Sequence, residues 1–175
     1  RLTTGLVESS YTWEPSADTF YHIAVVRNGT YLKVYIDGVA VISDSVSTTS
    51  LIASEDPFRI GAFNDATTAS PTLEWFFAGH VDEVRVTKGQ ARYIANFVPT
   101  TSAFEATDAT AQTQDPYFSN VKFLSSFDGD DGDTTTSGLD ESSSDLDLTY
   151  NSGDELSTTQ KKFGTTSLYV ADNVI

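Results

Sequence analysis

Residues 72–98 read TLEWFFAGHVDEVRVTKGQARYIANFV, and this stretch decides the fold. Its first part, 73–78, has the apolar and aromatic content expected of a β-strand buried on both faces. The apolar positions then change phase, because Val81 and Val84 are three residues apart and the next valine follows after two. Side chains of a strand alternate between its faces, so the odd interval requires an extra residue. We therefore predict a β-bulge at Asp82-Glu83 in an otherwise paired strand.

An antiparallel meander is predicted upstream, between residues 21 and 42. The strand YHIAVVR at 21–27 leads into Asn28-Gly29, a pair suited to the positive φ angles of a type I′ turn. The return strand at 31–36 alternates, with Leu32, Val34 and Ile36 on one face and Tyr31, Lys33 and Tyr35 on the other. Asp37-Gly38 turns the chain again into a third strand.

The remaining strand signals lie at 58–63, 120–127, 146–150 and 163–170. Residues 89–97 are too short for a stable helix and are expected to form one tight turn over the sheet edge, with Phe97 and Phe104 as plugs. Residues 105–115 contain no large apolar side chain, which predicts an exposed linker. Many short strands with regular turns indicate an all-β, antiparallel two-sheet β-sandwich or jelly roll.

The composition excludes several classes of partner. The chain has 25 acidic and 10 basic residues and a formal net charge of −15, which argues against nucleic acid and anionic membranes. Cysteine is absent, so disulfides and thiolate metal sites are excluded. The sequence contains no apolar run long enough to insert into a membrane and no signal peptide. Because it starts at Arg1 and contains no methionine, we expect a longer or processed natural product.

Several segments resemble a known family. FYHIAVVR at 20–27, VYIDG at 34–38, RIG at 59–61 and FAGHVDEVRV at 77–86 are similar to the latter half of a laminin-G-like, concanavalin A-like jelly roll. TKGQARYIANF at 87–97 is similar to an extension common in phage tail and other virion surface proteins. Phe20 stands where that family usually has Trp. The resemblance implies a two-sheet sandwich that serves as a binding or structural module of a larger virion or extracellular protein.

A second piece resembles the beginning of the same kind of domain, through PYFSNV at 116–121, FDG at 127–129, DESS at 140–143 and KKFGTTSLY at 161–169. The expected organisation is therefore the latter part of one unit at 1–104, a linker at 105–115, and the beginning of a unit at 116–175. This last part packs on 1–104 or on another copy. The order fits a window of a tandem array and equally a domain completed by a neighbour. We predict that 120–127 pairs with a jelly-roll strand and that another copy completes at least one strand set.

The segment FDGDDGD at 127–133 is the candidate cation site. Calcium prefers several oxygen ligands, and a Gly-rich turn lets carbonyl oxygens join carboxylates. The predicted ligands are Asp128, Asp130, Asp131 and Asp133. The spacing differs from an EF-hand, because Gly132 occupies a ligand position and no Glu follows at the right distance. The alternative is a solvated acidic turn.

No catalytic set is recognised in the sequence. Concanavalin-like glucanases use Glu-x-Asp-x-x-Glu on one strand, and here His80 and Arg85 stand where the two glutamates are needed. Asp82 and Glu83 are therefore expected to form a structural salt bridge to Arg85 or Arg92. His22 and His80 each lack a partner at metal-ligand spacing and are expected to be structural. We predict that the protein is not an enzyme.

Exposed aromatic side chains are the candidate ligand-binding residues. Trp13 is flanked by loop residues and Tyr11 lies beside it, so both could stack on sugar rings. Trp75 lies in the apolar run and is expected in the core. The first hypothesis is a non-catalytic carbohydrate- or receptor-binding module on a virion or extracellular surface. The alternative is a structural module that builds a tail, fibre or filament from copies of itself.

Overall fold

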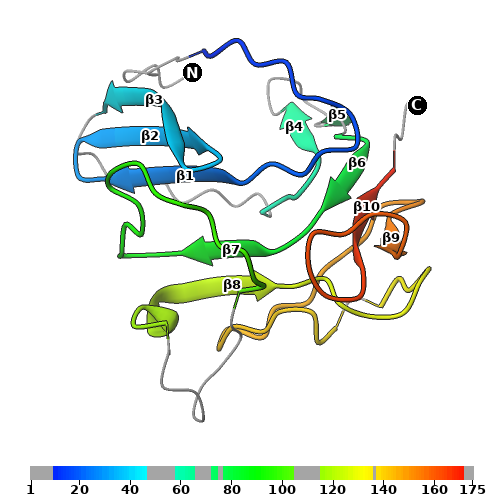
Figure 1. Cartoon of the computed structure of the whole chain (residues 1–175). Coiled ribbons are helices and arrows are strands. Elements are labelled where there is room, and N and C mark those ends of the chain that lie inside the picture. The colour runs from blue at the N-terminus through cyan, green and yellow to red at the C-terminus, as the bar shows by residue number, and fades with distance from the viewer. Residues whose placement is uncertain are drawn as a thin grey trace. The chain divides into compact units, whose positions relative to one another are not determined.

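The structure, a computed structural model, describes residues 10–46, 58–65, 72–74, 77–104, 115–135 and 137–171 (Figure 1). Every strand pair in these ranges is antiparallel, and the sheets have two or three strands each. The one helical element that the described ranges contain is the short 3₁₀ turn Phe118–Asn120. The predicted all-β, antiparallel class is therefore confirmed.

The chain divides into two compact units. Unit 1 comprises Arg1–Ala53 and Gly89–Thr101, and unit 2 comprises Ser54–Lys88 and Ser102–Ile175. The predicted linker, apart from Asp115, lies outside the described residues. Within the described ranges, no helix is long and apolar enough to cross a membrane.

Unit 1 contains the predicted meander, with strands β1 (Ile23–Asn28), β2 (Tyr31–Ile36) and β3 (Val39–Ser45) side by side (Figure 1). Asn28 pairs with Tyr31, so the first loop is Gly29-Thr30, one residue later than predicted. Gly29 alone has a positive φ there, which is the pattern of a type II′ turn and corrects the predicted type I′. The second loop has positive φ at both Asp37 and Gly38, as type I′ requires.

The segment 89–101 lies against one face of this meander. Tyr35 is fully buried, and the Phe97 ring packs on it at 5.4 Å between centroids. The backbone N–H of Phe97 donates to the carbonyl of Gly38 at 3.0 Å. A Cβ on Gly38 would meet the Phe97 oxygen at 1.9 Å, so only glycine permits this approach. Phe97 therefore packs as a plug, as predicted, although on the face of the sheet and not at its edge.

The described part of unit 2 contains three small sheets: β4–β5, β6–β10–β9 and β7–β8. Their strands are β4 (Phe63–Asp65), β5 (Thr72–Glu74), β6 (Gly79–Val81), β7 (Val84–Thr87), β8 (Val121–Ser125), β9 (Glu155–Ser157) and β10 (Ser167–Val170). β8 lies beside β7 with the opposite direction (Figure 1), so the predicted strand at 120–127 pairs within the chain. β10 likewise pairs with β6. Segments from both resembling pieces therefore share sheets.

The core of unit 2 is built around Phe127, Leu156, Leu168 and Val170, all buried. Val81 and Val84 from the strands β6 and β7, together with Ile60, Leu139, Leu148 and Tyr150, pack against this cluster. Apolar side chains from residues 60 to 170 thus enter one core, which explains how short strands far apart in sequence are held together.

Buried Asp140 closes the loop that follows β8. Its Oδ1 accepts hydrogen bonds from the N–H groups of Leu124 and Ser142, and its Oδ2 accepts one from Leu146. Burial alone raises the pKa of Asp140, but these backbone donors together lower it below its ordinary value. The N–H of Leu146 is thereby engaged at the start of the strand predicted at 146–150. The structure has no strand there, and places β9 at Glu155–Ser157 instead.

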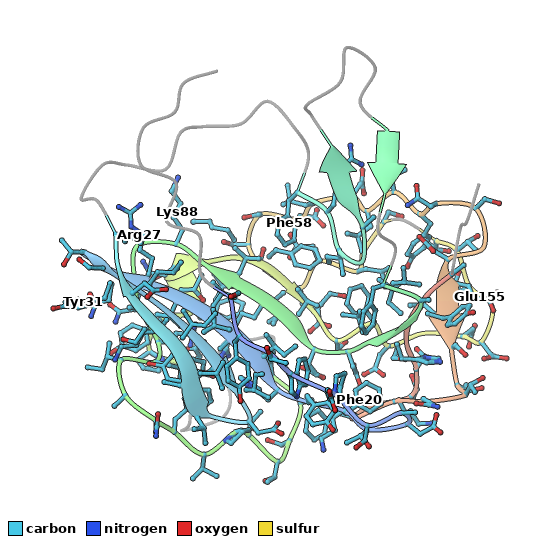
Figure 2. The ribbon with its side chains drawn as sticks, turned by 90° about the horizontal axis from the view of Figure 1, so that it is seen from above. Phe20, Arg27, Tyr31, Phe58, Lys88 and Glu155 are labelled. Carbon is cyan, nitrogen blue, oxygen red and sulfur yellow. The ribbon has the colours of Figure 1, made fainter. Side chains whose placement is uncertain are left out.

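The strand predicted at 58–63 is also wrong, because the chain bends at Ile60 and Gly61 before β4 begins. Gly61 has a φ of 77°, and a Cβ on it would meet the Val170 methyl groups at 2.8 Å. Phe58 is 69% exposed (labelled in Figure 2), as expected outside a buried strand. The predicted core residue Trp75 lies outside the described residues.

Candidate functional site

A cavity of about 260 Å³ lies on the meander of unit 1. Its floor consists of residues of one sheet face, since β1, β2 and β3 pair Asn28 with Tyr31, Val26 with Lys33, and Lys33 with Ser43. Side chains of a strand alternate between its faces, so these five residues point to the same side. The cavity is open, and Tyr31 at the end of the hairpin is 56% exposed (labelled in Figure 2).

The wall of the cavity is formed by Tyr93 and Ile94 from the segment 89–101. Phe97 stacks on Tyr93 with 3.7 Å between ring centroids and an interplanar angle of 9°, which fixes the Tyr93 ring. The Tyr35 hydroxyl donates to the Tyr93 carbonyl at 3.3 Å, and the Lys33 ammonium donates to the Ile94 carbonyl at 2.9 Å. The wall is therefore tied to the sheet before any ligand arrives.

The chemistry of the cavity is mixed. Val26 and Ile94 supply apolar surface, Tyr31 supplies an aromatic ring with a hydroxyl, and Asn28 and Ser43 supply neutral polar groups. Ligand sites commonly combine apolar and aromatic surface with a few polar groups that fix orientation. The cavity is a little smaller than the ~300 Å³ at which drug-sized sites begin. It can therefore accept one ring of a larger molecule.

The predicted ligand-binding residues Tyr11 and Trp13 also lie in unit 1. Tyr11 is 51% exposed and Trp13 is 36% exposed, so both present aromatic surface. Trp13 packs its ring edge to face with Tyr21 at 5.0 Å, and the Tyr21 hydroxyl accepts a hydrogen bond from the N–H of Ser16. Neither aromatic residue lines the cavity described above.

The acidic turn directs its carboxylates to separate partners. Asp128 Oδ1 accepts from the N–H groups of Thr165 and Thr166, Asp131 Oδ1 from the N–H and hydroxyl of Thr158, and Asp133 Oδ1 from those of Thr135. These bonds lower the pKa of Asp131 and of Asp133. Across the residues that the structure describes, no three His, Cys, Asp or Glu side chains are grouped as a metal site. Calcium bound by Asp128, Asp130, Asp131 and Asp133 stays a prediction.

The phase change at Asp82-Glu83 marks a break between strands. β6 ends at Val81 and pairs with β10, whereas β7 begins at Val84 and pairs with β8. Glu83 has a φ of 56°, which redirects the chain between the two strands. The predicted bulge in one continuous strand is therefore wrong, although the odd spacing located the irregularity correctly.

Asp82 and Glu83, the two carboxylates at this break, accept hydrogen bonds from backbone N–H groups. Asp82 Oδ2 accepts from the N–H groups of Lys162 at 2.6 Å and Phe163 at 3.0 Å, and Glu83 Oε2 accepts from the N–H of Phe104 at 2.7 Å. Arg85 has other partners: its Nη1 lies 4.0 Å from Asp115 Oδ2, and its Cζ lies 3.9 Å from the centre of the Phe104 ring. The predicted salt bridge is thus corrected to a set of backbone contacts.

Burial also dominates the charge state of this pair. Burial raises the pKa of Glu83 to about 7 against the single backbone hydrogen bond, and the carboxylates of Asp82, Glu141 and Asp128 add to the increase. Burial likewise raises the pKa of Asp82. Asp82 Oδ1 and Glu83 Oε1 are buried without a hydrogen-bond partner. The pair therefore holds chain segments together and is costly to ionise.

The two histidines have packing environments. His22 lies edge to face with Phe97 at 5.3 Å, next to the wall of the cavity in unit 1. In unit 2, His80 Nδ1 is 3.0 Å from the Ser167 hydroxyl, which donates to the Gln160 carbonyl. Because that hydroxyl proton is engaged, Nδ1 of His80 is the donor in their contact. Burial lowers the pKa of His80 and so favours the neutral ring, in the tautomer that carries its proton on Nδ1.

The cavity could not be predicted from the sequence. The alternation of β2 assigned Tyr31 and Lys33 to one face, but nothing marked that face as hollow. Tyr93 and Ile94 follow Lys33 by about sixty positions, and the hydrogen bonds that join them link segments that no local pattern connects. The run RYIANF at 92–97 was the available signal, since its two aromatic residues needed a surface to cover.

Comparison with protein families gives one match. The model described as the concanavalin A-like lectin/glucanases superfamily matches residues 4–91, which is about half of the chain. Comparisons with curated proteins and with solved structures gave no significant match. The matched region contains the whole meander and the strands β6 and β7. The chain thus belongs to the concanavalin A-like lectin/glucanase superfamily.

Proposed function

We propose that this protein is a non-catalytic carbohydrate- or receptor-binding module, displayed on a virion or extracellular surface as part of a β-sandwich of jelly-roll type. The observation that carries the proposal is the open cavity of unit 1, which combines an aromatic rim, formed by Tyr31 and Tyr93, with polar groups on its floor. Membership of a superfamily of lectins and glucanases supports the carbohydrate as ligand class. The missing glutamates at His80 and Arg85 support binding without catalysis.

The pre-formed wall favours binding of a sugar ring with little rearrangement. Phe97 and the Tyr35 hydroxyl hold Tyr93 in place, so little conformational entropy of Tyr93 is lost when a ligand binds. Tyr31 provides an exposed ring whose apolar face and hydroxyl suit a sugar, which also has apolar and polar faces. Tyr11 and Trp13 offer a second exposed aromatic surface in the same unit.

A glycan array with the full chain tests the proposal, followed by titration calorimetry of the best ligand. We expect binding that Tyr31→Ala weakens by at least tenfold, because aromatic anchors commonly contribute more than ~1.4 kcal/mol. Trp13→Ala is the parallel variant for the second surface. Both side chains are exposed, so each variant should keep its fold, which a thermal melt verifies. Failure to bind any glycan on the array would overturn carbohydrate binding as the function.

A structural, filament-forming module is the second candidate, and the other face of the meander favours it. Ile23 and Val25 on β1 and Val39 on β3 are 56%, 67% and 56% exposed. The register places all three on one face, which is the face of Val34 and Ile36. Exposed apolar patches commonly mark interaction surfaces, and a second copy is the partner that the self-assembly hypothesis requires.

Sedimentation velocity distinguishes the two candidates. Assembly through this face predicts concentration-dependent oligomers that Val25→Lys abolishes, because a charge there opposes burial of the face. A Tyr31→Ala variant should assemble normally, since Tyr31 lies on the opposite face. A monomer at all concentrations would rule out this candidate and leave the binding proposal intact.

A further inference from the structure

The cavity of unit 1 differs in charge from the chain that carries it. The chain as a whole has a formal net charge of −15. Of the described residues that line the cavity, Lys33 is cationic and none is acidic. Asp44, the carboxylate nearest in the register, pairs with Leu32 and therefore belongs to the opposite face of the sheet. The cavity therefore carries a positive charge, although the protein as a whole is acidic.

Lys33 is also held in a defined position. Its ammonium donates to the Ile94 carbonyl at 2.9 Å, which ties the side chain to the cavity wall. An ammonium has three N–H donors, so two remain for a ligand. The partner is a neutral carbonyl, so the positive charge is not compensated within the contact. Cations positioned in this way form hydrogen bonds with anions that are about twice as strong as neutral ones.

We infer that this cavity binds the carboxylate of an acidic sugar, such as a hexuronate, through Lys33, with the sugar ring against Tyr31. This inference rests on the proposed carbohydrate-binding function and names its ligand class. The carboxylate accepts from the two remaining N–H donors of Lys33, while Asn28 and Ser43 reach the hydroxyl groups of the ring. Within the described residues the side chains of Asn28, Tyr31 and Ser43 make no hydrogen bond, so their polar groups are available.

The arrangement favours a sugar over a simple anion. A free phosphate or acetate ion uses only Lys33 and leaves the aromatic rim and the apolar surface of Val26 and Ile94 unused. A hexuronate uses the cation, the ring and the neutral polar groups together. A sugar carboxylate is opposed by the net negative charge of the chain, and the Lys33 ammonium offsets that repulsion locally.

The experiment is a calorimetric or NMR titration of the full chain with two matched pairs, glucuronate against glucose and galacturonate against galactose. The members of each pair differ only at the carboxylate carbon. We expect the acid of at least one pair to bind about tenfold more tightly than its neutral partner. Lys33→Gln should remove this difference and Lys33→Arg should keep part of it. The same substitution at Lys122, an exposed residue of β8 in unit 2, is the matched control and should change nothing.

Asn28→Asp provides a second variant that leaves Lys33 and its bond to Ile94 in place. The new carboxylate should weaken binding of the acid more strongly than binding of the neutral sugar, because like charges repel at short distance. Equal affinity for acid and neutral sugar, unchanged in Lys33→Gln, would overturn this inference while the proposed function stands. If acetate displaced glucuronate at the same concentration as free glucuronate does, the inference would also be overturned, because the cavity would then bind any carboxylate without recognising the sugar. Absence of binding to every sugar on the glycan array would reject the proposed function itself.

Discussion

The replacement of Glu83 by Gln should stabilise the protein at neutral pH and leave its stability unchanged under mildly acidic conditions. Burial raises the pKa of Glu83 from 4.5 to about 7 in the folded protein. Between these values the unfolded state has lost the proton and the folded state keeps it. The contribution of Glu83 to stability is therefore fully present below pH 4.5. It is lost as the pH rises towards 7, where Glu83 ionises in the folded protein.

The size of the effect follows from that difference. At ~1.36 kcal/mol for each pH unit, the ceiling is ~3.4 kcal/mol. Glu83 is only partly buried, and solvent screens its charge, so about 1–2 kcal/mol is the expected loss. Gln keeps the acceptor for the N–H of Phe104 and cannot ionise. It also tolerates the positive φ of this position no worse than Glu does.

Chemical denaturation of the wild type and of Glu83→Gln, at half-unit steps from pH 4.5 to 8.5, measures the difference directly. The wild-type curve alone is insufficient, because the lowered pKa of His80 makes stability rise with pH below 6.5 and opposes the Glu83 effect. Subtracting the two curves removes that contribution. Parallel curves with no pH-dependent difference would refute the argument that Glu83 is protonated in the folded protein.

Three further predictions concern stability. Asp140→Ala should cost about 3 kcal/mol by denaturation, because it leaves three backbone N–H groups without their acceptor; a loss below ~1 kcal/mol would contradict this role. Gly38→Ala should destabilise unit 1 by more than ~2 kcal/mol, since strain at a φ of 80° is joined by a clash with Phe97, whereas Gly29→Ala, with open space around its Cβ, should cost only ~1–2 kcal/mol. If the acidic turn 128–133 binds calcium, a hundredfold excess over its dissociation constant should raise stability by ~2.7 kcal/mol, and chelation should reverse this. An unchanged melting temperature would show that this turn holds no calcium.

The meander of unit 1 could be predicted from sequence because its determinants are local. The alternation of β2 gives the face of each residue, and Asp37-Gly38 adopts the two positive φ angles that its composition allows. The shift at Asn28-Gly29 by one residue has a local cause as well. A lone glycine satisfies a type II′ turn at its first position, and Asn28 is then free to pair with Tyr31 as part of the strand.

The arrangement of unit 2 was less accessible because its strands are defined by distant partners. Val81 and Val84 belong to different sheets, since β10 and β8 reach them from segments about forty and more residues downstream. A bulge within one strand and a break between two strands both give the odd spacing of apolar residues seen at Val81 and Val84, so the sequence alone does not distinguish them. The strand predicted at 146–150 failed for a similar reason. Asp140 accepts a hydrogen bond from the N–H of Leu146, and the pattern of apolar residues cannot predict that contact.

The same reasoning explains why the family could be recognised and the ligand site could not. The segments that resemble the superfamily are turns, strand cores and the glycine positions that keep backbones close, all of which serve the fold. The cavity depends on the side chains that Tyr31 and Lys33 present between those positions, and on a wall that arrives from 89–101. A related chain with Gln at position 33 would keep these turns, strand cores and glycine positions. If the cavity binds acidic sugars as we infer, that preference would nevertheless be lost, because Gln carries no charge to attract the carboxylate.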